Sequence, residues 1–79
     1  MISSFVEKSL LKKRSITLAG HRTSVTLEDI FWEALKEIAE ENKIPLSKLV
    51  EKIDIERTSS LSGALRVYVA LYFMQKVKK

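Results

Sequence analysis

The sequence has no cysteine, a single histidine and only two glycines. Without cysteine the chain forms neither a disulfide nor a thiolate metal site, and one histidine is a poor basis for a zinc site. Two glycines leave no glycine-rich phosphate loop, and no acid–base pair accompanies His21. We therefore expect no metal, no cofactor and no enzymatic activity. A chain of 79 residues is also near the size at which one core is only marginally stable, so association with a second chain is the remaining way to gain buried area.

Long apolar segments are missing as well. The longest apolar run, residues 67–74, is far shorter than the ~20 residues that a membrane span requires. Residues 1–13 lack the charged start and the continuous apolar run of a signal peptide. We expect a cytoplasmic protein without a membrane segment. A hydrophobic content of 46% favours a folded domain over a disordered chain.

The net charge of +4 is unevenly distributed. Residues 1–26 hold five basic side chains and one acidic side chain, whereas residues 27–79 hold nine of each, so the whole excess lies in the N-terminal third. A basic N-terminal region commonly contacts nucleic acid or an anionic membrane. The alternative is a solvated segment that aids solubility.

The central feature is the alternation in residues 22–27. Thr23, Val25 and Leu27 share one side, and the other side holds Arg22, Ser24 and Thr26. β-Branched residues at period two predict a half-buried strand. A lone strand cannot satisfy its own backbone hydrogen bonds, so we predict pairing with the same strand of a second copy.

Residues 14–18 repeat the alternating pattern of that strand. Ile16 and Leu18 alternate with Ser15 and Thr17, and residues 19–21 can form a turn at Gly20. The segment is either an added strand or an extended arm, and the sequence leaves both open. We divide the chain into an N-terminal arm, residues 1–13, and a domain, residues 14–79.

Three helices are predicted after the strand. In the first, Thr26 caps the start, Asp29 completes a capping box and Asn42 marks the stop. The second begins near Pro45 and buries a face that ends at Ile53. Residues 54–60 form a connection, and Ser59 or Ser60 caps the third helix, which runs to about residue 76.

The third helix has almost no polar face. A helix that is apolar all round should be buried all round, which a small monomer cannot achieve. We predict that it contributes to a dimer interface. We further expect Arg66 to pair with a carboxylate of the other subunit and Trp32 to pack in the core or at the interface.

A strand, a helix, a short turn and a second helix in this order resemble the ribbon-helix-helix family of bacterial DNA-binding proteins. The residues that carry the resemblance are the alternating segment 22–27, Ile38-Ala39-Glu40-Glu41-Asn42, and the helix start at residues 46–50. More narrowly, residues 14–24, Leu27-Glu28, Phe31-Trp32 and the segment 61–67 look like a small uncharacterised subfamily associated with alphaproteobacteria.

The resemblance implies a mainly α fold with a short β-ribbon. Two chains would form an intertwined homodimer with antiparallel intersubunit strands, and this chain would add a C-terminal helix. The ribbon would enter the major groove of double-stranded DNA, with outward residues on the base edges. Those residues here are Arg22, Ser24 and Thr26. The alternative is that Arg22 is a solvated edge residue and that Ser24 and Thr26 are local caps.

The resemblance also implies phosphate contacts at the N-terminus of the second helix. On this chain the matching residues are Leu46, Ser47 and Lys48, although Pro45 departs from the usual hydroxyl or amide cap. An ordinary helix start is the alternative. From the residues themselves, Lys12, Lys13 and Arg14 could add non-specific contacts to phosphates.

We therefore expect a sequence-specific DNA-binding homodimer, a transcriptional repressor or autoregulator. The alternative is an antitoxin-like or other protein-interaction module that uses the same fold for dimerisation and binds a protein partner.

Overall fold

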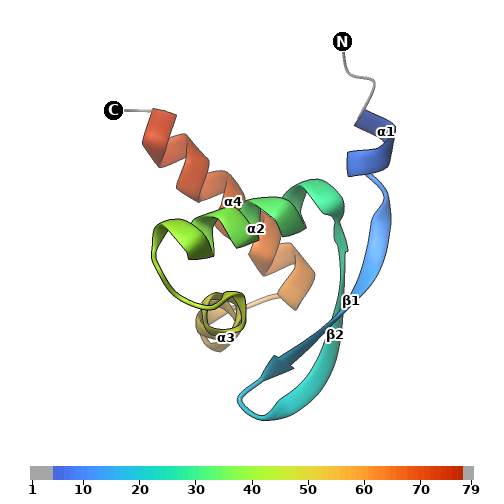
Figure 1. Ribbon diagram of the computed structural model, residues 1–79, viewed down its shortest axis with the longest axis vertical. Coiled ribbons are helices and arrows are strands. Elements are labelled where there is room, and N and C mark those ends of the chain that lie inside the picture. The colour runs from blue at the N-terminus through green and yellow to red at the C-terminus, as the bar shows by residue number, and fades with distance from the viewer. Residues whose placement is uncertain (1–4, 78–79) are drawn as a thin grey trace.

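The computed structural model describes residues 5–77 and consists of a β-hairpin followed by helices (Figure 1). A one-turn helix, α1 (Phe5–Lys8), precedes the strands β1 (Leu11–Leu18) and β2 (His21–Glu28). The three longer helices are α2 (Asp29–Glu41), α3 (Leu46–Glu56) and α4 (Leu61–Val77). This is the predicted mainly α fold with a short ribbon and an extra C-terminal helix.

The two strands pair with each other inside one chain. They are antiparallel, and the register runs from Leu11 opposite Glu28 to Leu18 opposite His21. Residues 14–18 are therefore an added strand, which begins earlier than predicted, at Leu11. The first partner of the strand at residues 22–27 is therefore β1 of its own chain, the alternative that the sequence left open, and not a second copy. Pairing with a second copy stays a prediction and concerns the other edge of β2.

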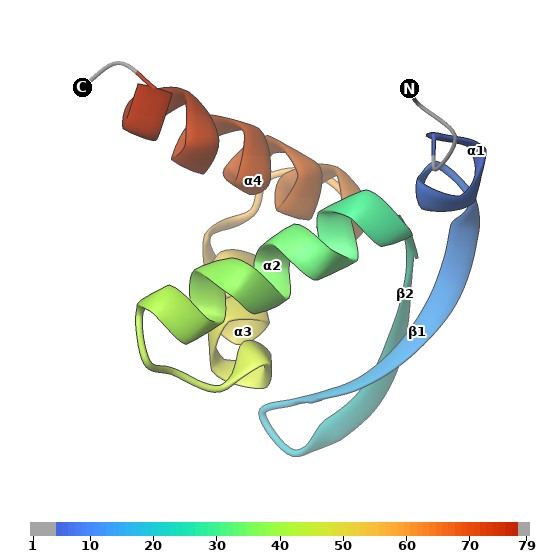
Figure 2. The same ribbon diagram turned by 45° about the horizontal axis from the view of Figure 1, so that its top comes forward.

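A two-residue turn joins the strands. Ala19 and Gly20 both have positive φ, 51° and 82°. Positive φ at both positions is typical of the tight hairpin turns whose twist matches that of the strands. The hairpin is visibly twisted, and its turn extends beyond the helices (Figures 1 and 2).

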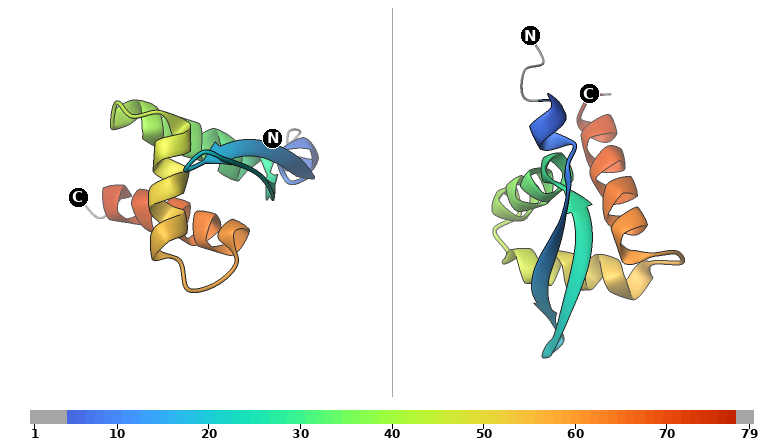
Figure 3. Two further views of the ribbon diagram at one scale, coloured as in Figure 1. Left: turned by 90° about the horizontal axis from the view of Figure 1, so that it is seen from below. Right: turned by 90° about the vertical axis from the view of Figure 1, so that its right-hand side faces the viewer.

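The helices cover one face of the hairpin (Figure 3). The buried side chains of the strands alternate with exposed ones, as period two requires. They join the inner faces of α2, α3 and α4 in a single apolar core. Its members are Ile16, Leu18, Val25, Leu27, Leu35, Ile38, Ala39, Leu49, Val50, Ile53, Leu65 and Val69.

The start of α2 differs from the prediction. Glu28, not Thr26, is the N-cap residue, and its side chain makes no capping hydrogen bond. Thr26 belongs to β2, so the predicted capping box is wrong. Tertiary pairing of β2 with β1 keeps the backbone extended for two residues beyond the position that local chemistry favours. Asn42 is the C-cap as predicted, but the left-handed residue is Lys43.

The later helices follow the sequence more closely. Pro45 is the N-cap of α3, and α3 continues to Glu56, so part of the predicted connection is helical. The Ser60 hydroxyl accepts a hydrogen bond of 3.1 Å from the Gly63 N–H, which confirms Ser60 as the cap of α4. Among the described residues, no helix is long and apolar enough to span a membrane.

Two ion pairs fix α4 to the rest of the chain. Arg66 Nε donates to Glu28 Oε1 at 3.0 Å, and Lys76 Nζ donates to Glu41 Oε2 at 2.7 Å. The predicted intersubunit partner of Arg66 is therefore replaced by Glu28 of the same chain. Each partner lowers the pKa of its carboxyl group, chiefly through the hydrogen bond that it donates.

Candidate nucleic-acid interface

The outward face of the hairpin carries the predicted base-contact residues. Arg22, Ser24 and Thr26 alternate with the buried Val25 and Leu27, and all three are exposed. The alternation of side chains along β2 places these three residues on one face. Because Val25 and Leu27 bury the opposite face, this face is the one exposed to solvent. The structure thus brings the three residues together as predicted.

The strand β1 enlarges this face. Directly paired residues of an antiparallel ladder lie on the same face. The register pairs Thr17 with Arg22, Ser15 with Ser24, and Lys13 with Thr26. All three β1 residues are exposed. Ser15 and Thr17 were not predicted as site residues, although the repeat in residues 14–18 was the signal that could have identified them.

We call these six residues, Lys13, Ser15, Thr17, Arg22, Ser24 and Thr26, the ribbon face. It offers one ammonium group, one guanidinium group and hydroxyls that donate or accept. Glu28 follows at its edge, but its carboxylate is engaged by Arg66. The chemistry of the ribbon face suits a polyanion that also presents hydrogen-bonding groups.

Thr26 is better placed than its sequence context suggested. A capping role would have occupied its hydroxyl at the start of α2. Because Thr26 lies in β2 and is exposed, its hydroxyl belongs to the ribbon face instead.

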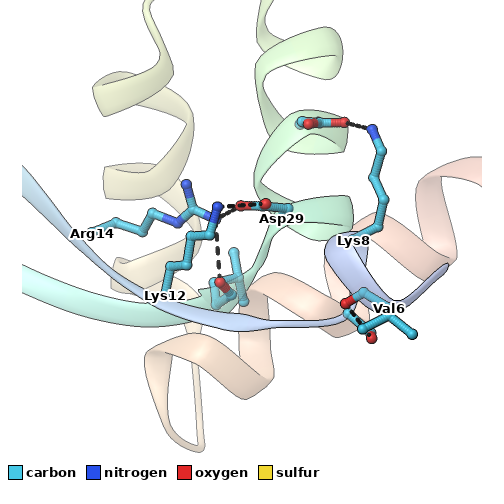
Figure 4. A network of polar contacts seen from close by, with 8 residues as sticks. Val6, Lys8, Lys12, Arg14 and Asp29 are labelled. Atoms are coloured by element: carbon cyan, nitrogen blue, oxygen red, sulfur yellow. Dashed lines mark hydrogen bonds and ion pairs between the residues drawn. The ribbon is translucent and has the colours of Figure 1, made fainter. Parts of the chain in front are cut away.

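Lys12 and Arg14 lie on the inner side of β1 and converge on Asp29 (Figure 4). Lys12 Nζ donates to Asp29 Oδ2 at 2.9 Å, and Arg14 forms an ion pair with the same carboxylate. The Arg14 guanidinium also lies 5.3 Å from the centre of the Trp32 ring, a cation–π contact. These donors lower the pKa of Asp29, with the hydrogen bond from Lys12 as the largest cause. Of the three predicted N-terminal cations, only Lys13 points to the ribbon face.

Trp32 is half-buried and packs against the core, as expected for a packing residue rather than a stacking platform for bases. At the N-terminal end of the hairpin, Lys8 forms an ion pair with Glu33 of α2 (Figure 4).

The middle of α3 lies near the hairpin turn. The Ala19 N–H donates to Glu51 Oε2 at 2.6 Å, which connects the turn to α3. In the first turn of the helix, the Lys48 N–H donates to the Pro45 carbonyl at 3.0 Å. Among the predicted phosphate contacts, Leu46 and Ser47 lie in the first turn of α3, where backbone N–H groups have no partner within the helix. Lys48 has an exposed side chain, and its Nζ lies 3.5 Å from Glu51 Oε1. Phosphate binding by these residues stays a prediction.

Comparison with known proteins identifies the same architecture. The family model of a ribbon-helix-helix domain matches residues 11–73. Among solved structures, the chain is similar to an uncharacterised protein of Bordetella pertussis Tohama I, with a TM-score of 0.80 and 26% sequence identity. That similarity covers 99% of this chain and 67% of the other. No curated protein matches the chain. The predicted alphaproteobacterial subfamily stays a prediction.

Proposed function

Since the chain belongs to the ribbon-helix-helix family, we propose that it is a sequence-specific DNA-binding homodimer that acts as a transcriptional repressor or autoregulator. The family supports DNA binding and regulation in general, and the ribbon face supplies the specific observation. Its exposed guanidinium, ammonium and hydroxyl groups lie on a two-stranded element of the kind that enters the major groove. The proposed site of action is the bacterial cytoplasm.

The dimer would use the unoccupied edge of β2. In a hairpin closed by Leu18 and His21, alternate β2 residues bond to β1, and the backbone groups of Arg22, Ser24 and Thr26 point the other way. Among the described residues, these three make no backbone hydrogen bond outside the hairpin. An exposed edge of this kind is a template for another strand. Antiparallel pairing with β2 of a second copy gives a sheet of four strands.

The width of that sheet implies that its central and outer strands contact different parts of the DNA. Neighbouring strands lie about 4.8 Å apart, and the major groove is about 12 Å wide. The two central strands fit within the groove, whereas the outer strands, about 14 Å apart, overlie its two phosphate walls. We therefore assign Arg22, Ser24 and Thr26 to base edges. Lys13, with Ser15 and Thr17, faces phosphates.

Fluorescence titration against fragments of the native genome tests the proposal. We expect one or a few fragments to bind at least about a thousandfold more tightly than random DNA of equal length, as specific regulators do. Equal affinity for all fragments at low salt would refute sequence-specific binding. Ser24 is the middle one of the three residues on the unoccupied edge of β2, and we propose that the two edges pair with the twofold axis at Ser24. A Ser24→Cys variant tests this arrangement, because the sequence has no other cysteine and the two thiols would lie close.

A protein-interaction module is the second candidate, and the exposed apolar side of α4 favours it. Val67, Leu71 and Met74 are each more than half exposed there. Purification from the native host distinguishes the candidates. A stoichiometric protein partner, with no preferred DNA fragment, would favour the interaction module.

A further inference from the structure

Helix α4 has two sides of different character. Leu65 and Val69 are buried in the core, and the flanking cations Arg66 and Lys76 are bound to Glu28 and Glu41. These contacts use every charged side chain that α4 carries between Leu61 and Val77. The opposite side is left without charge.

That opposite side follows a regular spacing. Gly63, Val67, Ala70, Met74 and Val77 recur at alternating intervals of four and three residues, the spacing of a helix–helix seam. The exposed fractions are 58% for Val67, 57% for Met74 and 84% for Val77, and Leu71 beside the row is 52% exposed. Ala70, Met74 and Val77 also line a shallow apolar hollow with Phe73. We call this row of five residues the α4 seam.

We propose that the α4 seam packs against the α4 seam of a second copy of this chain, in antiparallel orientation. The buried side of α4 packs in the core of its own chain, whereas the seam residues are not part of that core. The inference rests on the proposed function only in that both require self-association. It concerns a different surface from the edge of β2. The two lie closest where Arg66 of α4 binds Glu28 at the end of β2, and they diverge toward the C-terminal end of α4 and the hairpin turn (Figures 1 and 2).

The chemistry of the seam favours a copy of itself over other occupants. The seam residues themselves carry no charge, so they match an equally uncharged apolar surface better than phosphates or an acidic peptide. Glu56 and Arg57 lie beside the seam, in the hollow that Val67 lines. Its small residues, Gly63 and Ala70, allow close approach, while Val67 and Met74 fill the adjacent space. Two seams that cross at Ala70 bring the Gly63 end of each near the Val77 end of the other.

Charge selects the antiparallel orientation. Lys76 is the basic residue in the last turn of α4. A parallel pair would bring the two Lys76 side chains together, and would also bring the two negative helix ends together. An antiparallel pair separates the cations and sets opposite helix dipoles side by side.

Single-cysteine crosslinking tests the contact directly, because the sequence contains no cysteine. Under mild oxidation, Ala70→Cys should form an intermolecular disulfide, since the two Cβ atoms would lie near a twofold axis. Gln75→Cys is the control, exposed on the same helix but off the seam. Efficient crosslinking at position 75 with none at position 70 would overturn the proposal. Crosslinking at 70 with none at Ser24→Cys would uphold the seam and reject the intersubunit ribbon.

Sedimentation equilibrium supplies the second readout. Val67→Glu adds a charge to the seam at an exposed position, and we expect the midpoint concentration of self-association to rise about tenfold or more. Gln75→Glu carries the same change in charge off the seam and should leave the midpoint unaltered. An unchanged midpoint for Val67→Glu would refute the contact. If that variant instead lost binding to vesicles of anionic phospholipid, the seam would be a membrane contact and the proposal would fail.

Discussion

Asp29 is the residue on which Lys12 and Arg14 converge, two cations that the sequence also predicts to contact phosphate. The carboxylate lies in the first turn of α2, where the helix dipole also favours a negative charge. It therefore joins the start of α2 to the inner side of β1. The basic N-terminal segment is thus partly structural, and Lys13 is the cation left to the ribbon face.

The lowered pKa of Asp29 gives a pH dependence with a defined sign. A carboxyl group whose pKa is lower in the folded state stabilises that state above its ordinary pKa of about 4, and this stabilisation is lost as the pH falls through the lowered value. Urea unfolding of the Asp29→Asn variant should show lower stability than wild type at pH 7 and a smaller loss on acidification. Glu40→Gln, at an exposed position without an ion pair among the described residues, is the control. Equal acid sensitivity of wild type and Asp29→Asn would contradict the assignment.

Arg22 carries the only guanidinium of the ribbon face. If it reads a guanine, Arg22→Ala should reduce the preference for the specific fragment by about 1–3 kcal/mol, because a bidentate contact with the base is lost. Lys13→Ala should instead weaken binding to every fragment alike and lower the salt dependence by about one phosphate contact. Titrations of both variants at several salt concentrations separate these roles. A uniform loss for Arg22→Ala would make it a phosphate contact.

At the scale of elements, the hairpin depends on a turn with one unfavourable residue. Ala19 adopts a φ of 51°, a left-handed conformation that asparagine tolerates better, while Gly20 suits its φ of 82°. Asn-Gly is the preferred pair for such turns. The hairpin was predicted only as one of two alternatives, because the turn lacks that strongest local signal.

Ala19→Asn should therefore stabilise the protein by about 0.5–1 kcal/mol, and Gly20→Val should destabilise it by at least about 1 kcal/mol. Nothing lies within 4 Å of a Cβ built on Gly20, so backbone strain rather than a clash would cause the second effect. Urea unfolding measures both. No loss of stability in Gly20→Val would mean that the turn tolerates another geometry.

At the scale of the whole molecule, α4 takes part in one core and leaves a second apolar surface exposed. Leu65, on the core side of α4, is fully buried, whereas Val67, two residues later in the same helix, is 58% exposed. The helix is therefore an integral part of the single-chain fold as well as the proposed contact with another copy. One substitution on each side separates the two roles.

Leu65→Ala should lower the free energy of unfolding by about 2–5 kcal/mol, the usual cost of a cavity in a core. Val67→Ala should change it by less than about 0.5 kcal/mol at a concentration where the chain is dissociated. Thermal unfolding followed by circular dichroism compares the two variants. Equal effects would show that α4 is packed differently from the structure described.

The sequence by itself determined the elements whose signals are local. Period two in residues 22–27 defined a strand with Arg22, Ser24 and Thr26 on one face. Apolar spacing defined the helices, and the sequence narrowed the cap of the last one to Ser59 or Ser60, of which the structure selects Ser60. These features depend on neighbours within a few residues, so pattern alone identifies them. Only the tertiary structure decided that β1 pairs with β2, that Thr26 remains in the strand, that Asp29 binds Lys12 and Arg14, and that Arg66 finds Glu28 in its own chain. Each of these results depends on contacts between residues distant in sequence or on strand pairing that overrides a local cap. Periodicity specifies the face on which a side chain lies but not the partner that it meets there.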